Sequence, residues 1–348
     1  MSAVVFRCNA GPNVGIGHVV RCRELALELG RRGYASVMVG PGLDHAGPRD
    51  EAIFADWLPR PQWVSGAAEG AALAQIAETH GARHAVLDDY RVDVPFQEAL
   101  LGPGIRFMQQ FDGSRPPALF WADMVVNASP YERLDMYAEI MRKPGAAGLF
   151  GPAYAILRPE FPPAEVGDAG RPVRRVLLQF GGGDDRGAVL FALETLLAAA
   201  PQQVDFLVVS GRANPRNPEI AAFVAAHGAG RVALHVDPPA VAPLFASCDL
   251  AVMGGGTSTY EAAACGLPML ILAMADNQVR QAQGWVGLGG AEFLGRAGAV
   301  DAAELGRRFL ALVRDDARRA AMARAGRNLV DGAGVRRLAD HLVGELTA

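Results

Sequence analysis

Short apolar runs rich in β-branched residues alternate along the chain with longer segments of helical periodicity. Strands separated by helix-length connections pair in parallel, so this alternation predicts parallel α/β sheets. In the first half the pattern predicts strands at Val4–Cys8, Ala35–Val39, His84–Leu87, Arg106–Gln109 and Met124–Asn127, with helices at about Gly17–Leu29 and Glu69–Thr79.

The alternation is interrupted between Pro159 and Pro172 and then starts again. The interrupting segment reads PEFPPAEVGDAGRP, and proline and glycine at this density prevent regular structure. We therefore expect an amino-terminal Rossmann-like domain over residues 1–162 and a second one, with the carboxy-terminal helices, over residues 163–348. In the second half the pattern predicts strands at Arg175–Phe180, Asp205–Ser210, Val232–His235, Asp249–Met253 and Met269–Ala273, helices at Ala188–Ala200 and Thr257–Cys265, and a helical segment from about Ala302.

Composition supports a folded two-domain chain. Its 348 residues exceed what one hydrophobic core usually supports, and 51% hydrophobic with 20% charged residues is typical of globular proteins. A formal charge of -4 provides no broad basic field, so we expect no nucleic-acid partner. No apolar run approaches the length of about 20 residues that a membrane-spanning helix needs.

The four cysteines show no CxxC pairing, and the amino terminus lacks the basic start and long apolar stretch of a signal peptide. We therefore expect free thiols and a cytoplasmic protein. The scattered histidines fit no metal-ligand spacing, so no metal and no cofactor is expected. The cysteines are Cys8, Cys22, Cys248 and Cys265.

The first candidate site is the segment Gly11–Arg21, which joins a predicted strand to a helix. Gly15 and Gly17 allow close approach to the backbone, and the helix start favours an anion. The same positive helix end disfavours the imidazolium form of His18, so a neutral ring is available to accept a proton from water. Arg21 lies on the same helix face. Alternatively, His18 is a helix-start residue bonded to local backbone. Because position 20 is valine, the GxGxxG dinucleotide pattern is not met, which leaves NAD binding a distant possibility.

The second candidate site is the segment Gly254–Glu261, GGGTSTYE, which also joins a strand to a helix. Free backbone N–H groups at Gly255 and Gly256, together with the three hydroxyls of Thr257, Ser258 and Thr259, are suited to a diphosphate. Glu261, one turn into the helix, is positioned to reach vicinal hydroxyls or simply to complement the helix dipole. The segment matches neither a P-loop nor a GxSxG nucleophile motif.

Polar residues follow three other predicted strands. Gly182 lies in a glycine-rich loop that either contacts phosphate or is an ordinary tight turn. Asp88 and Asp89 end the strand before Tyr90, and because side chains alternate along a strand, we expect only one carboxylate to face the site and the other to cap a helix. After the strand Met269–Ala273, Asn277 and Gln278 offer amides for uracil, phosphate or sugar, with a helix cap as the alternative for Asn277.

These motifs resemble one family in order and spacing, over about residues 4 to 290. The family is the UDP-2,4-diacetamido-2,4,6-trideoxy-β-L-altropyranose hydrolases of pseudaminic acid biosynthesis, together with the related spore-coat polysaccharide proteins. The GGGTST segment is also similar to the nucleotide-binding helix of the lipid II-forming N-acetylglucosaminyltransferases, a likeness that implies a GT-B fold, two Rossmann-like domains facing across a cleft. The matching segments are FRCNAGPNVGIGHVVR (6–21), VLDDY (86–90), ADMVVNAS (122–129), GPAYAILRPEF (151–161), FGGGDD (180–185), GGGTSTYEAA (254–263) and ADNQ (275–278).

The resemblance also implies roles for individual residues. It makes His18 the catalytic base, with Asp88 and Tyr90 near the sugar, and it assigns no metal. It implies that loop and helix residues of the second candidate site contact UDP, and that Asn277 and Gln278 lie in the wall of the substrate cleft. The family usually has histidine or serine at position 89, so Asp89 is expected to alter sugar recognition. The UDP-binding residues implied are Thr257, Ser258 and Glu261.

We therefore expect the protein to hydrolyse a UDP-linked sugar, with water deprotonated by His18. A glycosyltransferase that moves the sugar to another acceptor is the first alternative, and a nucleotide-sugar binding protein without turnover is the second. The sequence does not indicate an oligomeric state.

Overall fold

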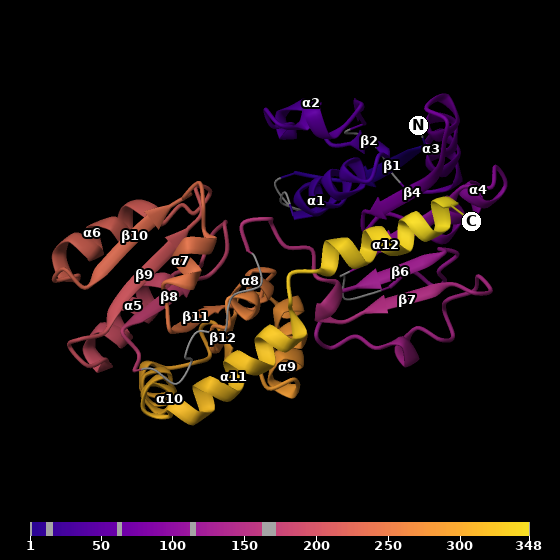
Figure 1. Ribbon diagram of the computed structural model, residues 1–348. Helices are drawn as coiled ribbons and strands as arrows, with labels where there is room; N and C mark the ends of the chain where they lie inside the picture. The colour runs from indigo at the N-terminus through magenta and orange to yellow at the C-terminus, as the bar shows by residue number, and fades with distance from the viewer. Residues whose placement is uncertain (1, 12–16, 61–64, 112–115, 162–171, 348) are drawn as a thin grey trace. The chain divides into compact units, whose positions relative to one another are not determined.

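The computed structural model describes residues 2–11, 17–60, 65–111, 116–161 and 172–347 (Figure 1). The chain forms two compact units. Unit 1 comprises Met1–Arg158 together with Ala333–Ala348, and unit 2 comprises Pro159–Gly332. The expected domain boundary between residues 162 and 163 lies outside the described residues.

Unit 1 is built on a seven-stranded, entirely parallel sheet with the order β3-β2-β1-β4-β5-β6-β7. Successive residues of β1 point to opposite faces. Val4 and Phe6 pack with helix α1, whereas Ala3 and Val5 pack with helices α3 and α4. Both faces of the sheet are therefore covered. The strands are β1 (Ala3–Cys8), β2 (Ala35–Gly40), β3 (Asp56–Pro59), β4 (Ala82–Asp88), β5 (Arg106–Gln110), β6 (Met124–Asn127) and β7 (Ala147–Phe150); the helices are α1 (Gly17–Arg31), α2 (Asp50–Ile53), α3 (Ala67–Thr79) and α4 (Val94–Leu101).

The last helix of the chain, α12 (Gly334–Thr347), belongs to unit 1. Leu338 and Leu342 are fully buried in the cluster that also contains Phe6 and residues of α1. The Asp340 carboxylate accepts a hydrogen bond of 2.6 Å from Arg32, at the end of α1. The sequence pattern had placed this helix in the second domain. The structure groups it with the first, because its apolar face is buried there.

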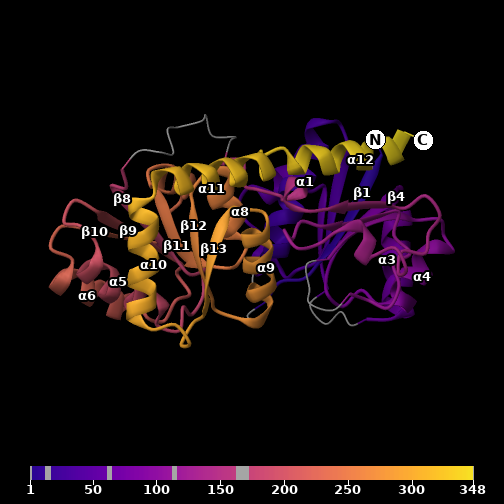
Figure 2. The same cartoon turned by 90° about the horizontal axis from the view of Figure 1, so that it is seen from below.

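Unit 2 repeats the plan with a six-stranded parallel sheet in the order β10-β9-β8-β11-β12-β13. Figure 2 shows β11, β12 and β13 side by side in this sheet. One core cluster joins the sheet to helices α5 and α10. The strands are β8 (Arg175–Gln179), β9 (Asp205–Ser210), β10 (Val232–Val236), β11 (Leu250–Gly254), β12 (Met269–Ala273) and β13 (Ala291–Arg296); the helices are α5 (Ala188–Ala199), α6 (Asn217–His227), α7 (Ala242–Ala246), α8 (Ser258–Ala264), α9 (Asp276–Gly287), α10 (Ala302–Arg314) and α11 (Asp316–Leu329).

Each sheet reverses its direction of growth at one position, between β1 and β4 in unit 1 and between β8 and β11 in unit 2. In open parallel sheets the loops at the carboxyl ends of the two strands flanking such a switch point form the ligand site. The expected fold class, two Rossmann-like α/β domains, is thus confirmed. Across the described ranges, no helix combines the length and apolar character that crossing a bilayer requires.

Candidate functional site

The switch point of unit 1 brings His18 and Asp88 together. His18 follows β1 in the first turn of α1, and Asp88 ends the adjacent β4. The His18 Nδ1 atom lies 2.6 Å from the Asp88 Oδ1 atom. Arg21, one turn along α1, donates from Nε to Oδ2 at 3.0 Å and from Nη2 to Oδ1 at 2.9 Å. The alternative of a histidine bonded to local backbone is therefore not what the structure shows.

The protonation of this group follows from its charges. Burial alone raises the pKa of Asp88, but the Arg21 guanidinium and the His18 ring outweigh it and lower that pKa to about 2. Nδ1 also lies 3.0 Å from Nη2 of Arg21. An ionised carboxylate only accepts hydrogen bonds, so we assign the proton in the shorter contact, at 2.6 Å, to Nδ1. In the neutral ring Nε2 then holds the lone pair. Asp88 and His18 are thus arranged as an oriented general base.

Tyr90 lies next to this pair. Its ring meets the His18 ring edge-on, with 4.7 Å between the ring centres and an angle of 83° between the planes. His18 is 3% exposed, whereas Tyr90 is 52% exposed. An exposed aromatic ring against the buried His18 ring provides an apolar surface at the carboxyl end of the sheet.

Asp89 does not cap a helix. It is buried and paired with Arg7 at 2.7 Å and with Arg91 at 2.9 Å. The cap of the following helix is Asp93, whose side chain accepts from the backbone N–H of Phe96. The expectation that one of the two carboxylates caps a helix is wrong. With its carboxylate turned to two arginines, Asp89 holds the segment before Tyr90 in place.

In unit 2 the loop after β11 is held by a side chain from α9. The Gln278 Oε1 atom accepts hydrogen bonds from the backbone N–H groups of Gly255, at 3.0 Å, and Met274, at 2.9 Å. Two donors on one atom identify it as the oxygen of the amide. Gln278 therefore joins the loops that follow β11 and β12. The Gly255 N–H, expected to contact a phosphate, is already occupied.

The rest of the glycine-rich loop is organised by Thr259, whose hydroxyl was expected to contact a diphosphate but is buried and hydrogen-bonded within the protein. Its hydroxyl donates to the Gly256 carbonyl at 2.7 Å and accepts from the indole Nε1 of Trp285 at 2.9 Å. Thr257 is exposed, and Ser258 and Glu261 are half-buried. Both hydroxyls and the Glu261 carboxylate lie at the start of α8, at the carboxyl end of β11.

Gly182 lies in the loop after β8, the other strand at the switch point of unit 2. A Cβ atom added to Gly254 would lie 3.5 Å from the Cα of Phe180, so the ends of β8 and β11 are in contact. Gly182 is exposed and its carbonyl packs against Gly211. The fold thus brings together both glycine-rich loops that the sequence singled out.

The remaining three candidates are Gly15, Gly17 and Asn277. Gly17 is the exposed first residue of α1, and Gly15 lies outside the described residues. Asn277 is exposed in the first turn of α9, whose cap is Ala275, so it does not cap the helix. Asn277 and Gln278 were expected in a loop and lie instead on this helix. The cysteines are free, three of them buried and Cys265 half-buried.

Comparison with known proteins shows one curated relative. The spore coat polysaccharide biosynthesis protein SpsG of Bacillus subtilis is 28% identical over 194 residues, which cover 54% of this chain and 56% of the relative. The matching region therefore spans about half the length of that protein. No family model matches the chain.

Solved structures match over nearly the whole chain. MurG of Acinetobacter baumannii has a TM-score of 0.70 at 14% identity and covers 98% of this chain and 99% of its own. A glycosyltransferase from Rickettsia africae has a TM-score of 0.68 at 12% identity, covering 99% and 98%. Anabaena HepE, solved in complex with UDP-glucose, has a TM-score of 0.62 at 13% identity, covering 99% and 100%. These likenesses show the fold: the chain has the two Rossmann-like domains of GT-B proteins.

Proposed function

We propose that this protein is a hydrolase that cleaves a UDP-linked sugar to the free sugar and UDP, with His18 as the general base. The observation that carries the proposal is the 2.6 Å contact between His18 Nδ1 and Asp88 Oδ1. This contact supports the tautomer that carries its proton on Nδ1 and leaves Nε2 to accept one. An oriented base of this kind activates a hydroxyl nucleophile, of which water is the smallest.

In the proposed reaction the oxygen of a water molecule forms a bond to the anomeric carbon of the sugar. The bond from this carbon to the β-phosphate oxygen breaks, and its electron pair leaves with UDP. The proton of the water passes to His18 Nε2, and the resulting imidazolium is stabilised by the Asp88 carboxylate. No separate acid is required, because a diphosphate is a good leaving group.

We assign the UDP part of the substrate to the second glycine-rich site. The start of α8 offers the hydroxyls of Thr257 and Ser258 to the diphosphate, with the Gly256 backbone in the same loop and Gly182 in the loop after the adjacent strand β8. The Glu261 carboxylate is assigned to the ribose hydroxyls. HepE, which shares the fold, is solved with UDP-glucose, and this supports a UDP-sugar as the ligand class.

For the sugar we propose a diacetamido-trideoxy hexose, a precursor of pseudaminic acid. The proposal rests on the resemblance of residues 6–21 and 86–90 to the hydrolase family and on the match to SpsG. Tyr90 supplies the exposed ring against which an apolar methyl group or an acetamido group packs.

The test is incubation of the protein with a panel of UDP-diacetamido-trideoxy hexoses, following free sugar and UDP by NMR. We expect UDP and free sugar in equal amounts without any added acceptor, and a loss of about 10³-fold or more in His18→Ala. Arg31→Ala, an exposed change at the other end of α1, is the matched control. If His18→Ala kept the wild-type rate, the assignment of the base would be wrong.

A glycosyltransferase is the second candidate, favoured by the fold that the chain shares with the Rickettsia africae glycosyltransferase. The same base would then deprotonate an acceptor hydroxyl instead of water. This candidate predicts that UDP release depends on an added acceptor, which the NMR assay distinguishes directly. A UDP-sugar binding protein without turnover would give neither product.

A further inference from the structure

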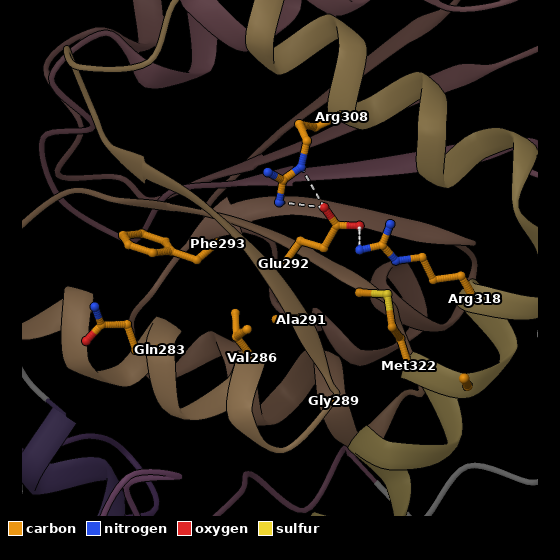
Figure 3. A pocket seen from close by; sticks show the side chains of 10 residues that line it. Gln283, Val286, Gly289, Ala291, Glu292, Phe293, Arg308, Arg318 and Met322 are labelled. Atoms are coloured by element: carbon orange, nitrogen blue, oxygen red, sulfur yellow. Dashed lines mark hydrogen bonds and ion pairs between the residues drawn. The ribbon is translucent and has the colours of Figure 1, made fainter.

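A second pocket lies in unit 2, away from the nucleotide-binding loops. It has a volume of about 610 Å³ and is lined by residues of α9, β13, α10 and α11 (Figure 3). Its apolar wall includes Val286, Phe293 and Met322. Phe293 in β13 pairs with Ile271, in the middle of β12, whereas the nucleotide-binding loops follow the ends of β11 and β12. The pocket is therefore separate from the proposed UDP site.

The polar side of the pocket is formed by one buried carboxylate between two arginines. Glu292 is 5% exposed, and its two oxygens lie 2.7 Å from Nη2 of Arg308 and 2.7 Å from Nη2 of Arg318 (Figure 3). Arg308 also faces Glu304 at 3.6 Å. The lining thus carries two guanidinium groups and one carboxylate, an excess of one positive charge.

Arg318 is the group able to bind a ligand. Its guanidinium is 49% exposed, and Glu292 is its ion-pair partner among the described residues. The pair is close but not aligned as a hydrogen bond, since Glu292 Oε1 has no aligned donor. Nε and Nη1 of Arg318 therefore remain for a ligand. Because they lie on different edges of the guanidinium group, each offers a separate charge-assisted hydrogen bond to a carboxylate or phosphate oxygen.

We propose that this pocket binds an organic anion with an apolar body, its carboxylate or phosphate on Arg318 and its apolar part against Phe293, Met322 and Val286. The mixed lining selects such a ligand over a free inorganic ion, which would leave the apolar wall exposed. It also selects against a cation, which would face the excess positive charge. A volume of about 610 Å³ is ordinary for a small-molecule site.

Helix α9 connects this pocket to the proposed UDP site. Its last turns line the pocket through Gln283 and Val286, and its first turn carries Gln278, which holds the Gly255 loop. In these last turns, Trp285 is hydrogen-bonded to Thr259 at the start of α8. Twelve helical residues span about 18 Å. A ligand between α9 and α11 therefore contacts the helix that also holds the Gly255 loop, and the Trp285 indole on this helix reports its binding.

The test is an NMR titration of the full chain that observes the indole N–H signal of Trp285, assigned with Trp285→Phe. The probes are phenyl phosphate, benzoate and inorganic phosphate, each with saturating UDP so that the nucleotide site is filled. We expect a saturable shift with at least one aromatic anion and a much weaker one with inorganic phosphate. A response to phenyl phosphate alone identifies an organic phosphate as the ligand, and a response to benzoate alone identifies a carboxylate.

Variants distinguish this pocket from other sites. Arg318→Gln should weaken binding at least tenfold, whereas Arg324→Gln, an exposed change on the same helix outside the pocket, should leave it unchanged. Ala321→Phe, an exposed lining position, should block binding without removing charge. Absence of a saturable shift with every probe, or equal affinity in the Arg318 and Arg324 variants, would overturn the proposal. This outcome is independent of the hydrolase proposal, because no turnover is measured.

Discussion

His18 Nδ1 lies 2.6 Å from Asp88 Oδ1, although 70 positions separate the two residues in the sequence. The switch point explains this contact. β1 and β4 are adjacent and parallel, with Cys8 opposite Asp88, so the helix that follows β1 starts beside the end of β4. The contact orients the ring, while Arg21 keeps the carboxylate charged.

The kinetic consequence of this contact is testable with Asp88→Asn. The amide removes the acceptor that holds the proton on Nδ1, so the ring loses the tautomer needed at Nε2. In steady-state assays with the UDP-sugar substrate we expect kcat to fall by about 10³-fold, with a much smaller change in KM. The double variant with His18→Ala should be little slower than His18→Ala alone, because the two residues act as a unit. Fully multiplicative losses would contradict this.

The low pKa of Asp88 also predicts a pH dependence of stability. Its pKa is about 2 in the folded protein and near 3.8 when unfolded, so the unfolded state binds the proton more tightly. The stabilisation is therefore complete above about pH 4 and is lost as the pH falls toward 2. The linkage corresponds to about 2 kcal/mol.

The measurement is urea unfolding of the wild type and Asp88→Asn between pH 2 and 5. From pH 2 to pH 5 the free energy of unfolding of the wild type should rise by about 2 kcal/mol more than that of the variant. Parallel pH profiles for the two proteins would show that Asp88 has an ordinary pKa.

Much of this site could be predicted from the sequence. Apolar runs such as Met269–Ala273 predicted the central strands, and a histidine at the helix start after the first strand indicated the proposed base. The edge strands Asp56–Pro59, Ala147–Phe150 and Ala291–Arg296 were missed. The first two have only four residues each, and all three are only partly buried, so their hydrophobic pattern is weak.

Other features depend on contacts that a pattern does not show. Because side chains alternate along a strand, we expected only one of Asp88 and Asp89 in the site. The sequence did not show that Asp89 is also buried, in an ion pair with Arg7. Arg7, a charged residue inside the otherwise apolar strand β1, was the sequence feature that could have indicated a buried ion pair. The role of Gln278 depends on the packing of α9, a helix that the sequence did not predict.

Asp89, which precedes Tyr90, forms ion pairs with Arg7 and Arg91, and we expect unequal effects when these two arginines are replaced. Burial lowers the pKa of Arg7 to about 10 although Asp89 opposes this, so Arg7 is charged at neutral pH. Arg7→Met removes a buried partner and should cost about 3 kcal/mol in the free energy of unfolding. Arg91 is 36% exposed in its side chain, so Arg91→Met should cost about 1 kcal/mol.

Chemical denaturation of both variants measures the two losses in the free energy of unfolding, and we expect the larger loss in Arg7→Met. A smaller loss in Arg7→Met than in Arg91→Met would mean that the exposed pair, not the buried one, holds Asp89.

Substitutions of Gln278 distinguish its structural role in holding the Gly255 loop from a role of this loop in UDP binding. In Gln278→Glu a carboxylate oxygen still accepts from the Gly255 and Met274 N–H groups, so the free energy of unfolding should change by less than about 0.5 kcal/mol. The new charge lies beside the proposed diphosphate, so UDP affinity measured by calorimetry should fall about tenfold. Gln278→Leu leaves two buried donors unsatisfied and should cost about 2 kcal/mol or more. If Gln278→Glu bound UDP as tightly as the wild type, the diphosphate would not lie at this loop.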